Sequence, residues 1–283
     1  MPTLAELTSY FQKNSCFQIT SDGTQFFYQN EATGVYCTFE YDPKPEPEPD
    51  LSPCYATGLS FNLNYNRPSF FAYETMPLVE DFCRHFSLCA EDPDEALLSE
   101  PDKEKLISTW RRHNSSAIRA MTSSADPELQ FDLAYMPEPK ATAWWTYMRD
   151  RQTIEDSLTE DLFVPSILLL ESPQKRLELT IVWPDGIAQF FPSCDYVYME
   201  RTRKKFFGTE KQRGRVAYRD VVSALGPLLV TRNTAAGPLM CLPPDTKNEA
   251  ASVVQRLNLY PIELSQYTRV SSDSFHDVEL PPR

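Results

Sequence analysis

Strict alternation of apolar and polar residues is the clearest pattern in the first third of the chain. From Leu59 to Asn66, every second residue is apolar, and each residue between them is serine or asparagine. A period of two with one apolar side predicts a strand in a sheet that is covered on one face and wet on the other. Similar patterns predict an antiparallel meander of four strands, at residues 17–20, 24–29, 35–41 and 59–66.

Helical spacing follows this meander. Apolar residues recur every three to four positions at 76–88, which predicts a helix that covers the dry face of the sheet. Ser99 and Asp102 have the spacing of a capping box ahead of a second helix, whose apolar residues extend to Met121. The same spacing predicts a third helix at about 140–158.

The pattern then returns to strands and ends in two helices. Pro184-Asp185-Gly186 lies between two apolar runs and predicts a hairpin, because proline presets φ and glycine accepts a positive φ. The residues from Ser265 onward are polar and predict a loose tail. The predicted second meander has strands at 163–171, 176–183, 187–191 and 195–200, followed by a helix at 218–229 that breaks around Gly226-Pro227 and a helix capped by Thr246 and Glu249.

These elements predict an α+β fold of two similar antiparallel meander-plus-helix halves joined by a helical segment. A short internal similarity favours this duplication, since Asp22-Gly23 and Asp185-Gly186 are both followed by Gln and Phe-Phe. Coincidence explains so short a match equally well. The predicted parts are an N-terminal half at 1–98, bridging helices at 99–160, a C-terminal half at 161–264 and a polar tail at 265–283.

Charge is distributed unevenly along the chain. The formal net charge is −13, yet the segment 201–219 holds eight basic residues against one acid, Glu210, a local charge of +7 that leaves −20 elsewhere. Such a field steers a partner or pairs one part of the molecule with another. The apolar fraction of 41% and the aromatic fraction of 12% are typical of a globular protein and exclude the disordered class.

Cysteine usage and hydropathy bear on the compartment. Seven cysteines lie at irregular spacings, several of them in apolar runs, which favours reduced thiols in the cytoplasm over a disulfide framework. The first residues have no basic region followed by an apolar run, so no secretory signal is expected. Apolar runs such as 164–170 are far shorter than the roughly 20 residues of a membrane span, so no membrane is expected among the partners.

No set of residues in the sequence matches a catalytic or metal-binding template. Cys83, His85 and Cys89 resemble metal ligands, but on a helix at about 100° per residue they point in different directions. Gly208 and Gly214 lack the Lys-Ser or Lys-Thr that completes a phosphate-binding loop. We therefore predict no catalytic residues, no metal and no cofactor.

Three groups of residues are candidates for binding a partner. The wet face of the N-terminal sheet is an adaptable hydrogen-bonding surface, with a plain solvated face as the alternative. Adjacent tryptophans on one helix cannot both face the same core, so one is expected at an interface between the halves or with a partner. Three bases of the basic segment complete the set, unless that segment is a hairpin that pairs internally. The candidates are Tyr36, Thr38, Glu40, Asn62, Asn64, Trp144, Trp145, Arg203, Lys204 and Lys205.

An acidic chain without catalytic motifs favours binding by surface complementarity. The leading hypothesis is a non-enzymatic cytoplasmic protein-binding module, for example an immunity protein whose acidic surface speeds association with a basic toxin. One alternative is a nucleic-acid-binding protein that uses the basic segment 201–219, which the −20 elsewhere disfavours. The other alternative is an enzyme of unrecognised class.

Overall fold

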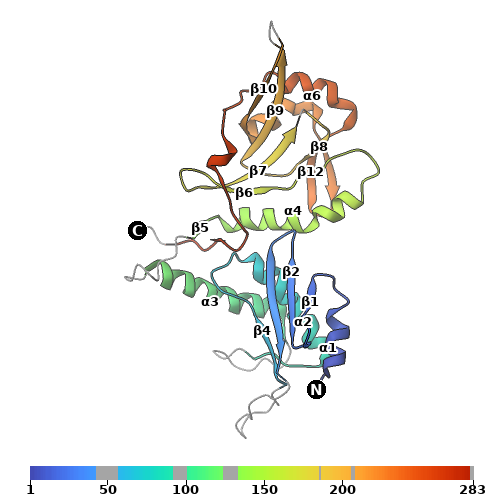
Figure 1. The fold of residues 1–283 in the computed structure, drawn as a ribbon, viewed down its shortest axis with the longest axis vertical. Coiled ribbons are helices and arrows are strands. Elements are labelled where there is room, and N and C mark those ends of the chain that lie inside the picture. The colour runs from blue at the N-terminus through green and yellow to red at the C-terminus, as the bar shows by residue number, and fades with distance from the viewer. Residues whose placement is uncertain (43–56, 92–100, 124–132, 185, 205–207, 281–283) are drawn as a thin grey trace. The chain divides into compact units, whose positions relative to one another are not determined.

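The computed structural model describes residues 1–42, 57–91, 101–123, 133–184, 186–204 and 208–280. The fold is α+β, as the sequence predicted. The chain divides into two compact units, the first formed by residues 1–133 and 272–283 and the second by residues 134–271 (Figure 1). The second unit is thus an insertion within the sequence of the first.

The first unit contains a four-stranded antiparallel sheet in which the strands follow one another in sequence order. Each strand pairs with the next, so that Phe27, Thr38 and Asn62 lie side by side across three strands. The last strand is shorter than predicted, because the chain leaves the sheet after Asn62 and turns through Asn66, which has a φ of +63°. The strands are β1 (Phe17–Ile19), β2 (Gln25–Asn30), β3 (Val35–Tyr41) and β4 (Leu59–Asn62).

Helices cover the apolar face of this sheet. Helix α1 (Leu4–Phe11), which the sequence pattern did not predict, begins with a capping box between Thr3 and Glu6. Helix α2 (Phe70–Phe86) begins six residues before its predicted start and lies against β3, and α3 (Lys103–Ser123) packs on α2. Aromatic rings join these layers, with Phe11 stacked on Phe26 at 4.3 Å and on Phe82 at 5.4 Å.

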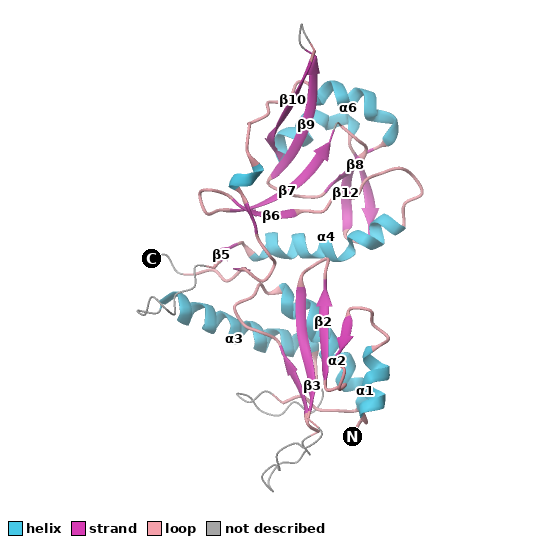
Figure 2. Cartoon of the chain, in the orientation of Figure 1, coloured by secondary structure: helices cyan, strands magenta, loops and turns pink. Residues whose placement is uncertain are grey.

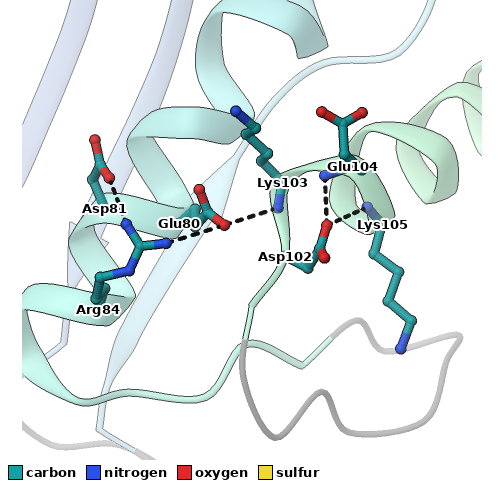
Figure 3. A network of polar contacts seen from close by, with 7 residues as sticks. All are labelled: Glu80, Asp81, Arg84, Asp102, Lys103, Glu104 and Lys105. Atoms are coloured by element: carbon teal, nitrogen blue, oxygen red, sulfur yellow. Dashed lines mark hydrogen bonds and ion pairs between the residues drawn. The ribbon is translucent and has the colours of Figure 1, made fainter.

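The start of α3 is fixed by a polar network that reaches α2 (Figure 3). Asp102 caps the helix itself, since its carboxylate accepts hydrogen bonds from the backbone N–H groups of Glu104 (2.8 Å) and Lys105 (3.2 Å). The carboxylate of Glu80 on α2 forms an ion pair with Arg84 at 3.2 Å and accepts a hydrogen bond from the backbone N–H of Lys103 at 3.4 Å. Ser99, the other half of the predicted capping box, lies outside the described residues.

The second unit is built around a mixed five-stranded sheet (Figure 2). All of its strand pairs are antiparallel except β7 with β9, which is parallel. In spatial order its strands are β10 (Thr209–Ala217), β9 (Tyr196–Lys204), β7 (Leu177–Pro184), β6 (Leu168–Glu171) and β13 (Thr268–Arg269). A separate three-stranded sheet has the order β11 (Val230–Thr234), β12 (Gly237–Leu242) and β8 (Gln189–Phe191).

The remaining elements are helices and short segments. Helix α5 contacts β9 and β10, and it ends at Gly226-Pro227, as predicted. The helices are α4 (Glu138–Asp156), α5 (Tyr218–Leu225) and α6 (Lys247–Val254), with 3-10 turns at Gly226–Leu228, Pro244–Thr246 and Leu264–Gln266. Two further short strands are β5 (Ala134–Tyr135) and β14 (Phe275–His276).

The predicted hairpin after Trp183 is wrong. Gly186 has the expected positive φ of 69°, and the Trp183 indole N–H donates to the carbonyl of Ile187 at 2.9 Å, so the chain does turn there. The next strand, however, pairs with β12 in the other sheet, and the chain returns to pair with β7 in parallel. This crossover also contradicts the predicted antiparallel meander in this part of the chain, and the duplication of two similar halves stays a prediction.

The predicted cap of the last helix is also wrong. The side chain of Thr246 makes no cap hydrogen bond to α6, and its hydroxyl donates instead to the carbonyl of Pro243 at 2.8 Å, in the preceding 3-10 turn. Across the described ranges, no helix has the length and apolar character that a membrane crossing requires.

Candidate binding surfaces

The polar face of the four-stranded sheet has the composition that the sequence predicted. Strand register places Tyr36, Thr38 and Glu40 on the same face as Asn62, and the Gln25 side-chain amide donates to the Glu40 carboxylate at 3.4 Å. Asn62 is exposed and the three β3 residues are half-buried. Asn64 is exposed in the loop that follows β4 and is not a member of the strand.

Tyr36 is engaged within the first unit. Its hydroxyl accepts a hydrogen bond from Nη2 of Arg67 at 2.8 Å and donates to Oδ2 of Asp273 at 3.2 Å. The chain segment that carries Arg67 is held by Asn114, whose side chain is 1% exposed and accepts from the backbone N–H of Asn66 at 2.7 Å. One end of the polar face is therefore a rigid, hydrogen-bonded surface.

The C-terminal segment belongs to the interior of the first unit, in contrast to the loose polar tail that the sequence predicted. Phe275 is fully buried, with its ring 6.1 Å from that of Phe70. Asp277 accepts hydrogen bonds from the backbone N–H of Ser69 at 2.8 Å and from its hydroxyl at 3.1 Å. This carboxylate satisfies the start of α2, where no side chain of the helix itself provides a cap.

A half-buried carboxylate on α2 joins the helix to the β2–β3 turn. One oxygen of Glu74 accepts hydrogen bonds from the hydroxyl of Tyr28 (2.9 Å), the amide of Asn30 (2.8 Å) and the hydroxyl of Thr33 (3.1 Å). Burial, with the negative charge of Glu74 beside it, raises the pKa of Tyr28 well above its usual range. Three donors on one oxygen are the arrangement of a structural anchor.

The basic segment forms the long β9–β10 hairpin of the second unit, and Arg201 within it is buried. Its Nη1 donates to the carbonyls of Val254 (2.9 Å), Gln255 (3.1 Å) and Leu257 (2.7 Å) at the end of α6. Its Nε donates to the Gln212 side chain at 3.1 Å. A cation at a helix C-terminus satisfies free carbonyls and complements the helix dipole, so Arg201 has a structural role.

Other bases of the hairpin pair with acids of the same sheet. Glu200 binds Lys211 at 2.9 Å and Arg213 at 2.5 Å, and these two hydrogen bonds lower the pKa of the Glu200 carboxyl. These pairs agree with the interpretation of the segment as an internally paired hairpin. Arg203 and Lys204 lie in β9, with side chains outside the described part, and Lys205 lies outside the described residues.

Arg215 is the most enclosed of these ion-paired bases. Its guanidinium lies 4.0 Å from the ring centre of Tyr196 and 5.6 Å from that of Tyr267, and Nη1 binds Glu178 at 2.5 Å. Burial raises the pKa of Glu178, and the neighbouring Arg215 charge acts in the opposite direction. Arg215 thus crosses Tyr196 on the outer face of the sheet.

Beyond Arg215 this outer face is more open. Val182 pairs with Tyr198 across two strands and is 37% exposed, although it lies on a central strand. The next pair along the strands is Pro184 with Glu200. An exposed apolar position beside a half-buried tyrosine and a charged rim has the composition of a binding surface.

The two tryptophans predicted to include an interface residue are both buried. Trp144 is 5% exposed, and its indole N–H donates to the carbonyl of Ile167 at 3.2 Å. Trp145 is 7% exposed, with the Arg149 guanidinium 4.6 Å from its ring centre. Neither indole presents an open anchor to a partner in this structure.

The residues that resemble metal ligands have other surroundings. The His85 ring lies 4.6 Å from Phe86 and 4.9 Å from Tyr10, and burial raises the pKa of Cys83 to about 11, with a smaller contribution from Cys89. Among the residues that the structure describes, no group of three or more His, Cys, Asp or Glu side chains is placed to hold a metal ion.

The two units differ strongly in formal charge. The sequence of the first unit holds 24 acidic and 10 basic residues, a formal charge of −14, whereas the second holds 16 acidic and 17 basic residues, a charge of +1. The acidity of the chain therefore belongs to the first unit as a whole. The sequence contains every charged residue, but the charge of each unit can be added up only when the unit boundaries are known.

Comparisons of the chain with models of protein families, with curated proteins and with solved structures found no match.

Proposed function

We propose that this chain is a protein-binding module whose first unit binds a basic partner protein through the polar face of its four-stranded sheet. The observation that carries the proposal is the charge of −14 on a unit whose sheet is packed by helices on one face and polar on the other. A strongly charged surface speeds the encounter with an oppositely charged partner. In its specific form the proposal is an immunity-type protein that neutralises a basic toxin in the cytoplasm.

The proposed face combines two properties of protein interfaces. Glu40 and Asn62 provide polar groups with solvent access, and Phe27 lies between them and β1 as a half-buried ring. Tyr36 is positioned by Arg67, so this end of the face loses little side-chain entropy on binding. The six cysteines in the described ranges are free thiols, which agrees with a reducing compartment.

The test measures association of the purified full-length chain with each protein encoded by a neighbouring gene, at low and at high salt. Glu40→Lys removes an acid from the proposed face and Asn62→Lys adds a base to it, and we expect a much slower association when both are made. Glu104→Lys, the control, makes the same charge change as Glu40→Lys at an exposed residue of the same unit, on α3 and away from this face.

The outcomes separate the face from the overall field. A partner whose binding is lost with the two face substitutions and retained with Glu104→Lys supports the proposal. Equal slowing by all the charge changes would show that general electrostatics and not this face directs the encounter. Absence of association with every product tested at low salt would contradict the function.

A further inference from the structure

Two exposed bases on the outer face of the five-stranded sheet pair with one carboxylate. Oε2 of Glu200 accepts from Nε of Arg213, and Oε1 accepts from Nζ of Lys211 at 2.9 Å. The side chains of Arg213 and Lys211 nevertheless remain 61% and 67% exposed. Because the Glu200 contact uses Nε, the two terminal nitrogens of Arg213 lie outside that ion pair and suit a bidentate contact with phosphate.

An aromatic side chain lies one step away on the same face. Tyr198 is two residues before Glu200 on β9, a separation of about 7 Å along a strand. Its register partner on β7 is the exposed Val182, whereas the ring of Tyr196 is covered by Arg215 at 4.0 Å. Tyr198 is thus an aromatic residue of this face that lies close to these two bases.

The charge distribution makes an anionic partner compatible with this unit. Residues 196–217 of the hairpin hold seven basic and two acidic residues, and the second unit as a whole has a formal charge of +1. Of the charge of −20 outside residues 201–219, −14 belongs to the first unit and −6 to the rest of the second unit. Most of the acid that disfavours a polyanion therefore belongs to the unit that does not carry these bases.

We propose that the outer face of β9 and β10 binds single-stranded nucleic acid, with phosphates at Arg213 and Lys211 and a base against Tyr198. A ring beside oriented cations, at about the spacing of one extended nucleotide, suits this ligand, because every base has a face that can stack on an aromatic side chain. In a duplex the bases stack on each other, so no base is free to stack on Tyr198. This activity goes beyond protein binding and uses the other unit.

The experiment is fluorescence anisotropy with labelled oligouridine and oligothymidine dodecamers and the full-length chain, at about 50 and about 200 mM salt. We expect saturable, salt-sensitive binding that Tyr198→Ala weakens by about 5- to 100-fold and Tyr198→Phe preserves. Arg213→Gln should weaken binding and reduce the slope of log affinity against log salt by about 0.7. The RNA and DNA arms show which sugar is preferred.

The matched control is Arg84→Gln, because Arg84 is 66% exposed and pairs with Glu80 and Asp81 on the first unit. Its affinity should equal that of the wild type, and thermal melting of each variant shows that it is folded. No saturable binding at the lower salt, an equal loss in Arg84→Gln, or unchanged affinity in both Tyr198→Ala and Arg213→Gln would overturn the proposal. Duplex binding as tight as single-strand binding would also overturn it. So would a result in which binding of polyglutamate depends on Tyr198 and Arg213 while binding of oligonucleotides does not.

Discussion

The carboxylate of Asp277 binds both the backbone N–H and the hydroxyl of Ser69, at 2.8 and 3.1 Å, although the two residues are 208 positions apart in sequence. The contact places the charge of a C-terminal side chain at the start of α2. It joins the last described segment to the helix that covers the sheet of the first unit.

Asp277→Ala should lower the free energy of unfolding by about 1–3 kcal/mol, because it leaves the start of α2 without its acceptor in a buried environment. Chemical denaturation followed by circular dichroism measures the change. Glu279→Ala is the control, since Glu279 lies two residues further on and is exposed. Equal effects of the two substitutions would show that the Ser69 contact contributes nothing specific.

His276 should make stability depend on pH. Burial lowers the pKa of this imidazole below its ordinary value of 6.5, so the folded state binds the proton less readily than the unfolded state. Its contribution is complete above pH 6.5 and is lost as pH falls from there toward the lowered pKa. The stability difference between wild type and His276→Gln, measured by denaturation from pH 8 to pH 5, should shift in favour of the variant as pH falls. A constant difference across this range would contradict the prediction.

Arg201→Met should destabilise the second unit by about 2 kcal/mol or more, because it removes the donor shared by the three carbonyls at the end of α6. Thermal unfolding monitored by calorimetry tests this. Arg219→Met serves for comparison, because the Arg219 side chain is 89% exposed and its contact with Asp220 is long, at 3.5 Å. If both variants melt like the wild type, the buried contacts of Arg201 are not stabilising.

Gln189→Leu should raise stability by about 1 kcal/mol. Gln189 is fully buried on β8, and neither polar atom of its side-chain amide has a hydrogen-bond partner among the described residues, so an apolar side chain of similar size removes a desolvation penalty. Urea unfolding of the two proteins provides the comparison. A loss of stability would mean that the amide makes a hydrogen bond worth more than its desolvation.

The sequence predicted those strands, helices and turns that depend on residues close to one another in the chain. Alternation over 35–41 identified β3, and the helical period around Trp144 identified α4, because one buried face imposes its own repeat on the chain. The turn at Gly186 was identified by the backbone freedom of glycine. What the next strand pairs with is decided by long-range packing, and nothing near Gly186 encodes that β8 joins β12.

The candidate surfaces show the same limit. The polar face containing Thr38 and Asn62 follows from strand period alone and was predicted. The buried role of Arg201 was not predicted. Its partners are backbone carbonyls more than 50 residues away, and every residue has a backbone carbonyl, so the sequence does not mark which ones Arg201 binds. The Tyr36–Asp273 contact was not predicted either, because it requires the C-terminal segment to pack against the first unit, and the polar composition of that segment does not indicate this.

The insertion of residues 134–271 within the first unit has a consequence for synthesis on the ribosome. The strands and helices of residues 1–133 emerge early, but Phe275 and Asp277 emerge only after the whole inserted unit. The usual order, in which the N-terminal domain completes folding first, is therefore reversed. During synthesis the start of α2 therefore lacks the Asp277 carboxylate until the inserted unit has been made. A chain without residues 272–283 lacks part of the first unit.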